Sequence, residues 1–267
     1  MITSPSNLQV RSVAALHKRS EREQTGLFLI EGRTEVERAA AAGIELVAVY
    51  RLSGSDPFTI KGNHENVELG EMAFQKLAYG RDGIVATAVA PRFKLEDLPL
   101  SVRAPGLTPM RNDPTLVLVV ESIEKPGNLG AIIRTADAAG AALIVSDPVT
   151  DLVNPNVVRA SIGSLFSVPM AAASTGDAID YLKERSILIL AAVVGSGAAP
   201  WAVDLTGPSA IDIGSEHSGL SSGWVRAADH EITLPLSGTA DSLNASVAAA
   251  VILYEAIRQR SDHQHSG

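Results

Sequence analysis

Continuous apolar segments that alternate with helical segments dominate the second half of this chain and constrain its fold most. Apolar runs typical of strands occur at residues 116–120, 143–145, 167–171, 187–194 and 210–213. Helical composition separates them at residues 128–139, 154–161 and 177–185. Strands without polar alternation belong to parallel sheets that helices cover on both faces. We therefore predict an α/β fold with a mainly parallel sheet.

Ligands of such sheets bind beyond the carboxyl ends of the strands, so the loops at that edge are candidate sites. They span residues 121–127, 195–200 and 214–219, and a fourth candidate is the polar loop that follows residue 232. This last loop leads into a helix for which Asn244 or Ser242 is the expected N-cap. Helical spacing places four apolar residues on one stripe, which we expect to face the core: Val247, Val251, Tyr254 and Ile257.

Composition excludes several classes of protein. The 267 residues, 46% of them hydrophobic, suffice for one large domain or two smaller ones with full cores. The absence of cysteine excludes disulfides, thiol catalysis and cysteine-held metals, and the six histidines lack metal-ligand spacing, so we expect no metal. No apolar run reaches membrane-spanning length, so we expect no membrane partner. A net charge of -8 argues against indiscriminate binding of nucleic acid across the whole surface.

The first half of the chain carries a local basic cluster, formed by Arg11, His17, Lys18, Arg19 and Arg22. It is either a nucleic-acid contact or a solvated helix face, and composition does not decide between them. Strands are predicted at residues 27–30, 46–50 and 83–89, and a helix at residues 33–42.

Five prolines between residues 91 and 114 disfavour regular structure and indicate an interdomain linker. The expected division is therefore residues 1–95, a linker at 96–114, a second domain at 115–260 and a disordered tail at 261–267.

Two common nucleotide-binding motifs fail in the candidate loops. Gly195 and Gly197 begin a dinucleotide fingerprint, but Pro200 replaces its third glycine. Residues 214–219 have the glycine spacing of a P-loop, but Leu220 replaces the lysine of the Lys-Ser/Thr pair that the motif requires. These departures argue against a nicotinamide oxidoreductase and a P-loop nucleotidase.

Three loop sequences together match another pattern. Residues 128–134 carry N-x-G-x-x-x-R, residues 214–219 carry G-x-E-x-x-G, and residues 234–248 combine Leu-Pro-Leu with Ser-Leu-Asn-Ala-Ser. In this order they resemble the SpoU (TrmH-type) branch of the SPOUT RNA 2′-O-methyltransferases. The resemblance covers about residues 115–260, and Phe28-Leu-Ile-Glu-Gly32 extends it to the family's small N-terminal α/β RNA-binding domain, which is like ribosomal protein L30.

The resemblance implies a deep trefoil knot in the C-terminal domain, which no general folding rule favours. It also implies S-adenosylmethionine as cofactor, held largely by backbone groups at Ala192, Gly214, Leu234 and Leu243. The implied catalytic residues are Arg134, Asn128, Asn244 and Glu216. We expect Arg134 to hold a phosphate and stabilise the developing alkoxide, because arginine is a poor general base.

The resemblance further implies a cytoplasmic homodimer that methylates ribosomal RNA, expected to be 23S rRNA. The RNA-binding candidates are Lys18, Arg19, Arg22 and Arg33. An antibiotic-resistance role of the thiostrepton or avilamycin type is a further expectation. Methylation of tRNA and a catalytically silent RNA-binding homologue remain the alternatives.

Overall fold

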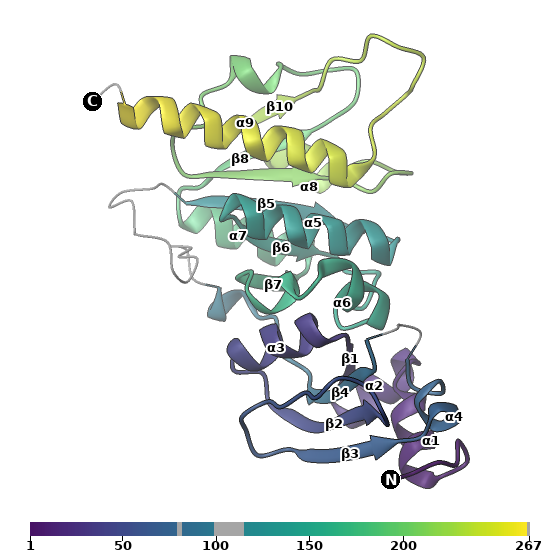
Figure 1. Cartoon of the computed structure of the whole chain (residues 1–267). Helices are drawn as coiled ribbons and strands as arrows, with labels where there is room; N and C mark the ends of the chain where they lie inside the picture. Colours follow the sequence, from purple (N-terminus) through teal and green to yellow (C-terminus); the bar gives the residue numbers. More distant parts are fainter. Residues whose placement is uncertain (79–81, 99–114, 266–267) are drawn as a thin grey trace. The chain divides into compact units, whose positions relative to one another are not determined.

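The computed structural model describes residues 1–78, 82–98 and 115–265 (Figure 1). The chain forms two compact units, of which the first holds residues 1–91 and 151–167 and the second holds residues 92–150 and 168–267. Residues 151–167 thus belong to the first unit, although the expected division placed them in the second domain. Most of the expected linker, residues 99–114, lies outside the described residues.

The second unit is built on a six-stranded sheet in the order β10-β8-β9-β5-β6-β7. All five neighbouring pairs are parallel, which confirms the predicted α/β class. The first strand of this unit along the chain, β5, lies inside the sheet, and β9 lies between it and β8. The strands are β5 (Leu116–Glu121), β6 (Ala142–Ser146), β7 (Met170–Ala173), β8 (Leu188–Ala192), β9 (Ser209–Ile213) and β10 (His230–Ile232).

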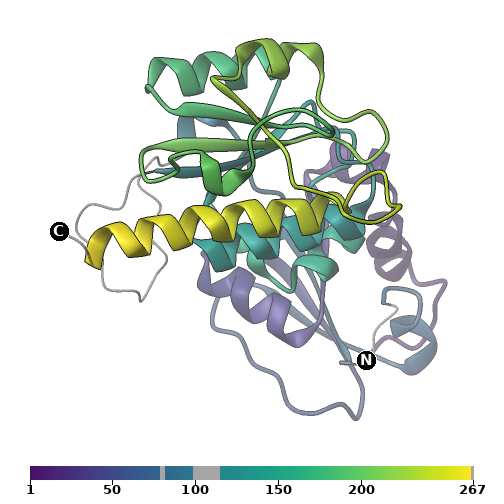
Figure 2. The same ribbon diagram turned by 90° about the horizontal axis from the view of Figure 1, so that it is seen from above.

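Helices cover both faces of this sheet. One face carries α5 (Pro126–Ala139) and α9 (Ala245–His265), which pack side by side (Figure 2). The other carries α7 (Thr175–Glu184) and α8 (Ser222–Ala227), whose Tyr181 and Trp224 join Val119 and Ile189 in a core cluster. Short 3-10 turns complete the unit: η1 (Leu95–Asp97) and η3 (Pro200–Ala202).

The last helix differs from its prediction in two ways. The stripe expected to face the core is exposed, since Val247, Val251 and Tyr254 are 47%, 44% and 51% accessible. The buried side instead carries smaller residues such as Ala249 and Ala256, together with Ile252 and Leu253. Because the helix is apolar on more than one side, spacing alone did not identify the buried face. The helix also continues to His265, into the segment expected to be a disordered tail.

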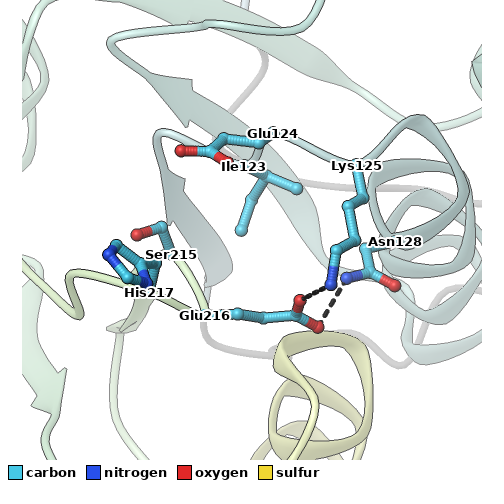
Figure 3. Close-up of a pocket in the computed structure, with 7 residues that line it drawn as sticks. All are labelled: Ile123, Glu124, Lys125, Asn128, Ser215, Glu216 and His217. Atoms are coloured by element: carbon cyan, nitrogen blue, oxygen red, sulfur yellow. Dashed lines mark hydrogen bonds and ion pairs between the residues drawn. The ribbon is translucent and has the colours of Figure 1, made fainter.

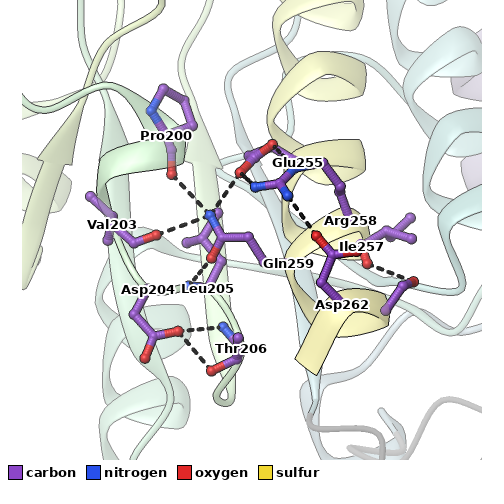
Figure 4. A network of polar contacts seen from close by, with 11 residues as sticks. Pro200, Val203, Asp204, Leu205, Thr206, Glu255, Ile257, Arg258, Gln259 and Asp262 are labelled. Atoms are coloured by element: carbon purple, nitrogen blue, oxygen red, sulfur yellow. Dashed lines mark hydrogen bonds and ion pairs between the residues drawn. The ribbon is translucent and has the colours of Figure 1, made fainter. Parts of the chain in front are cut away.

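Side chains near the end of α9 form hydrogen bonds with the connection between β8 and β9 (Figure 4). The Gln259 amide donates to the carbonyl of Val203 and accepts from the backbone N–H of Leu205, at 3.1 and 2.9 Å. The buried Arg260 guanidinium donates to the carbonyls of Leu205 and Gly207. These bonds fix the helix end and satisfy the carbonyls of an irregular segment.

The first unit contains a four-stranded sheet in the order β1-β4-β2-β3, in which only β2 and β3 are parallel. One face packs on α1 and α4, and the other carries α3 and α6. The short polar strand β3 was not predicted, because its sequence, ENVEL, lacks an apolar run. The elements are α1 (Leu8–Ala15), α2 (Arg19–Thr25), β1 (Leu27–Glu31), α3 (Arg33–Ala41), β2 (Leu46–Leu52), β3 (Glu65–Leu69), α4 (Glu71–Phe74), β4 (Ile84–Val89), α6 (Pro155–Ser161) and η2 (Ser164–Phe166).

Within the described ranges, no helix combines the length and the apolar character needed to cross a membrane.

Candidate functional site

Three polar side chains from distant parts of the sequence meet at the carboxyl edge of the parallel sheet. Asn128 lies in the first turn of α5, which begins at Pro126, a residue suited to the first helical position. Glu216 lies in the loop that follows β9. Asn244, one of the two predicted N-cap candidates, precedes α9 and caps it, since its side-chain oxygen accepts from the backbone N–H of Ser246 at 3.0 Å. The three side chains therefore lie close together because two of them follow neighbouring parallel strands and the third lies at the start of a helix.

The Glu216 carboxylate is the centre of this cluster (Figure 3). Its Oε1 accepts from Asn128 Nδ2 at 2.6 Å and from Asn244 Nδ2 at 2.5 Å. Its Oε2 pairs with the ammonium of Lys125 at 2.5 Å. Asn244 Nδ2 also donates to Asn128 Oδ1 at 3.2 Å. The cluster brings together three of the four predicted catalytic residues and adds Lys125, which was not predicted as a site residue.

Electrostatics keep the central pair charged. The hydrogen bond from Lys125, followed by that from Asn128, lowers the pKa of Glu216 in spite of some desolvation. The same contact raises the pKa of Lys125. An ionised carboxylate with a lowered pKa is a weak base, so Glu216 is better suited to orienting its partners than to removing a proton.

A pocket of about 410 Å³ opens beside the cluster and has a largely apolar lining. All four predicted cofactor residues line it: Ala192, Gly214, Leu234 and Leu243. Gly214 packs so closely on the backbone of Gly219 and Leu220 that a side chain at this position would collide with them. The tight loop thereby presents backbone groups to the pocket, as a ligand held by main chain requires.

A second pocket of about 310 Å³, lined mainly by polar residues, shares part of the same loop. Its wall includes Ile123, Glu124, Lys125 and Asn128. Residues 215–217 line both pockets, so Glu216 stands between them.

Arg134, the fourth predicted catalytic residue, lies apart from this cluster. It is exposed on α5, and in the described part of the chain its side chain makes no hydrogen bond or ion pair. Six residues separate it from Asn128, which on an α-helix corresponds to roughly 9 Å along the axis and a different face. Arg134 is therefore a surface residue of α5.

The four predicted RNA-binding residues have different environments. Lys18 and Arg19 are exposed, and Arg19 pairs with Glu23 at 2.7 Å. Arg33 donates to the carbonyls of Asp56 and Pro57, and its guanidinium lies 4.8 Å from the centre of the Phe58 ring.

Arg22 is not an RNA contact in this structure, contrary to the prediction. Its side chain is only 3% exposed and donates twice to Asp151 Oδ2, at 2.8 and 2.5 Å. Its third bond goes to the Leu16 carbonyl at 2.7 Å. A buried arginine with these partners stabilises the first unit and is inaccessible to a phosphate.

Two buried acids near the site were not predicted as site residues, although Glu121 begins one of the candidate loops and Asp212 lies within a predicted strand. Glu121, at the end of β5, accepts from the backbone N–H of Ser221 at 2.6 Å and so anchors the end of the 214–220 loop. Asp212, in β9, is fully buried, and among the described residues neither of its carboxylate oxygens has a hydrogen-bond partner. Desolvation first, and then the nearby charge of Glu121, raise the pKa of Asp212 well above its ordinary value.

The fold and site define an α/β protein with a ligand pocket and a polar cluster at the carboxyl edge of a parallel sheet. Residues 115–254 match the model of the SpoU rRNA methylase family, and residues 7–83 match an MRM3-like substrate-binding domain. The chain therefore belongs to the SpoU rRNA methylase family, as its three loop motifs had indicated.

Individual relatives agree with this assignment. A 23S rRNA (uridine(2479)-2′-O)-methyltransferase of Streptomyces viridochromogenes is 40% identical over 57% of this chain and 55% of its own length. The 23S rRNA (guanosine(2553)-2′-O)-methyltransferase RlmP of Bacillus subtilis is 29% identical over 95% of this chain and 97% of its own. The structure of the SpoU methyltransferase AviRb from Streptomyces viridochromogenes, in complex with the cofactor AdoMet, superposes with a TM-score of 0.83 at 30% identity, covering 96% and 98% of the two chains.

Proposed function

We propose that this protein transfers a methyl group from S-adenosylmethionine to a ribose 2′-hydroxyl of ribosomal RNA, specifically 23S rRNA. The observation that carries the proposal is the position of Glu216 between an apolar pocket and a polar one. A methyl donor and an acceptor nucleotide must lie side by side, and this arrangement provides two adjacent sites. The names of the two 23S rRNA enzymes and the bound AdoMet in AviRb support the same reaction.

The residues of the apolar pocket fit S-adenosylmethionine. The lining of Ala192, Leu234 and Leu243 suits an adenine ring, and the crowded Gly214 loop offers backbone donors and acceptors. When bound, S-adenosylmethionine supplies a methyl group on a positively charged sulfur that leaves as a neutral thioether. The ionised Glu216 at the pocket boundary favours a positive charge there.

The polar cluster positions the acceptor ribose. Asn128 bonds to Glu216 and Asn244, so its second amide hydrogen and second oxygen lone pair have fixed directions toward a ligand. Asn244 uses its amide hydrogens on Glu216 and Asn128 and its oxygen on Ser246, so it holds the cluster in place. Fixing the 2′-hydroxyl in line with the donor removes much of the entropic barrier to reaction. In this proposal Arg134 binds the phosphate next to the acceptor and stabilises the developing alkoxide.

We further propose that two copies form a homodimer through α9. Three exposed apolar side chains lie along this helix, which also packs against α5, the helix that carries Arg134. A surface stripe of this kind is typical of an interface. Because Arg134 contacts nothing in its own polar cluster, we assign it to a site that the partner copy completes. Tyr254→Glu should place a charge in this interface and shift the protein from dimer to monomer in sedimentation velocity.

The remaining proposals concern architecture and role. We infer that α9 passes through the connection between β8 and β9 as part of a trefoil knot, which would explain why Gln259 and Arg260 bond so extensively to it. The first unit serves as an L30-like RNA-binding domain in which Lys18, Arg19 and Arg33 contact phosphates. The protein works in the cytoplasm, and resistance to a drug of the thiostrepton or avilamycin type follows if the modified nucleotide lies in a drug site.

Transfer of labelled methyl from S-adenosylmethionine to unmodified bacterial RNA tests the reaction. We expect label in 23S rRNA and none in tRNA, with Gly214→Val as the control because its side chain would disrupt the donor loop. Label in tRNA alone would preserve the chemistry and overturn the substrate. Binding of S-adenosylmethionine without label in any RNA would instead favour a silent RNA-binding homologue.

A further inference from the structure

The polar pocket beside Glu216 carries an asymmetric set of charges that identifies what it binds. Glu124 and Glu216 contribute carboxylates, and Lys125 contributes the one lysine or arginine among its lining residues. The Lys125 ammonium is already paired with Glu216. A phosphate entering here would meet an excess of negative charge, whereas a neutral group with its own donors and acceptors would not. The pocket therefore suits a base or a sugar better than a phosphate.

The shape and lining of this pocket favour the base. Its volume of about 310 Å³ is in the range of small-molecule sites. In Figure 3 the Ile123 side chain projects between those of Glu124 and Lys125, and the His217 ring lies across the pocket. The exposed imidazole ring provides a surface on which a flat ring can stack, while the polar groups lie at its edge.

Glu124 and Lys125 offer opposite hydrogen-bonding characters at that edge. Lys125 is 70% exposed and keeps two N–H groups after pairing with Glu216. The exposed Glu124 carboxylate only accepts when ionised, and in the described part of the chain it makes no hydrogen bond. The two residues are consecutive in the chain, and both line the pocket.

We propose that this pocket receives the base of the acceptor nucleotide, and that Lys125 and Glu124 select a base with an imino N–H beside a carbonyl oxygen. Lys125 donates to the carbonyl, and Glu124 accepts from the imino group. Uracil, with O4 and N3–H, and guanine, with O6 and N1–H, satisfy this pattern. Cytosine and adenine present an amino donor and a ring-nitrogen acceptor in the same places, so both contacts become unfavourable. This inference rests on the proposed function and adds base specificity to it.

The test begins with the nucleotide that the wild-type protein methylates in 23S rRNA, which we expect to be uridine or guanosine. An RNA fragment around this position is then made with the reversed base, cytidine for uridine or adenosine for guanosine. We expect the wild-type kcat/KM to fall by about 10- to 100-fold, the range of a lost pair of base contacts. A mapped cytidine or adenosine, or equal rates on both fragments, would overturn the inference.

Variants connect this selectivity to the two residues. Lys125→Met and Glu124→Gln should each reduce the ratio of kcat/KM values between the two fragments at least about 5-fold. A loss of folded protein lowers both rates and leaves this ratio unchanged, so the ratio reports base reading and not stability. The matched control is Lys94→Met, because Lys94 pairs with Glu96 at 2.6 Å on the same unit, and its Lys–Glu pair is not among the pocket residues.

The two proposals fail in different ways. Methylation that keeps its full selectivity in both variants would refute base reading and leave the proposed reaction intact. Glu216→Gln distinguishes base recognition from the positioning of the cluster. It removes the charged partner of Lys125 but keeps both groups proposed to contact the base, those of Lys125 and Glu124. This variant should lower the rates on both fragments while largely keeping their ratio. Absence of transfer by the wild-type protein to any RNA would refute both proposals.

Discussion

Replacement of Arg22 by alanine should destabilise the first unit without removing an RNA contact. The change deletes three hydrogen bonds of a side chain that is 3% exposed. It leaves the Asp151 carboxylate, which is 16% exposed, without its cation, and the Leu16 carbonyl without its donor. Removal of one partner from a buried ion pair costs about 3–5 kcal/mol, because the remaining charge stays desolvated.

Urea unfolding followed by circular dichroism measures this loss. For a chain of this size about 3–5 kcal/mol corresponds to a decrease in Tm of roughly 6–20 °C. The control is Lys18→Ala, which changes an exposed residue nearby and should alter the free energy of unfolding by less than about 0.5 kcal/mol. Under conditions where Arg22→Ala remains folded, its RNA affinity should equal that of the wild type.

A double variant separates the ion pair from simple loss of packing. Arg22→Met combined with Asp151→Asn removes both charges and keeps much of the volume, so it should be more stable than Arg22→Ala. A loss below about 1 kcal/mol in Arg22→Ala, together with weakened RNA binding, would refute the structural role. Arg22 would then belong to the basic RNA-binding cluster after all.

Three further predictions concern the second unit. Arg134→Ala should lower methyl transfer by about 100-fold or more and leave the Kd for S-adenosylmethionine unchanged in calorimetry, because Arg134 acts on the RNA; an equal loss of both would contradict its assignment. Asn244→Ala removes a helix cap worth about 1 kcal/mol and two contacts of the cluster, so kcat should fall far more than stability; a fall in stability alone would make this residue only a cap. Asp212→Asn tests a buried acid whose pKa is raised in the folded protein. Proton binding to this acid favours the folded state, so its contribution to stability is full below the pKa of the unfolded state and is lost as the pH rises through the folded-state pKa. The variant should therefore exceed the wild type in free energy of unfolding near neutral pH, by a margin that shrinks as the pH falls toward about 4; a constant margin would show that this group does not titrate differently on folding.

The sequence predicted the parallel sheet and most of its helices because fully apolar strands leave few alternative folds. It also predicted Asn128, Glu216 and Asn244 as one site, although long stretches of chain separate them. Their motifs lie at the carboxyl ends of strands or at helix starts, and a parallel sheet gathers those ends at one edge. The residues themselves came from the resemblance to the SpoU branch, whereas the topology indicated only the loops near them.

The errors have a common physical cause, which is that burial depends on distant partners. Arg22 resembles its exposed neighbours in sequence, but its partner Asp151 is 129 residues away. The last helix has apolar residues on several sides, so the choice of buried face depends on α5 and β9. Lys125 was overlooked because only the position of Glu216 gives it a role. Asp212 is buried because every position of its strand is buried, which its own residue type does not indicate.

The position of the transferred methyl group tests the central claim most directly. Ribosomal RNA treated with the protein and labelled S-adenosylmethionine would be digested to nucleosides and analysed by mass spectrometry, with Asn244→Ala as the matched control. We predict one 2′-O-methylated nucleoside from 23S rRNA, strongly reduced with the variant. A methyl group on a base, or a ribose methyl formed equally well without Asn244, would contradict the proposed site.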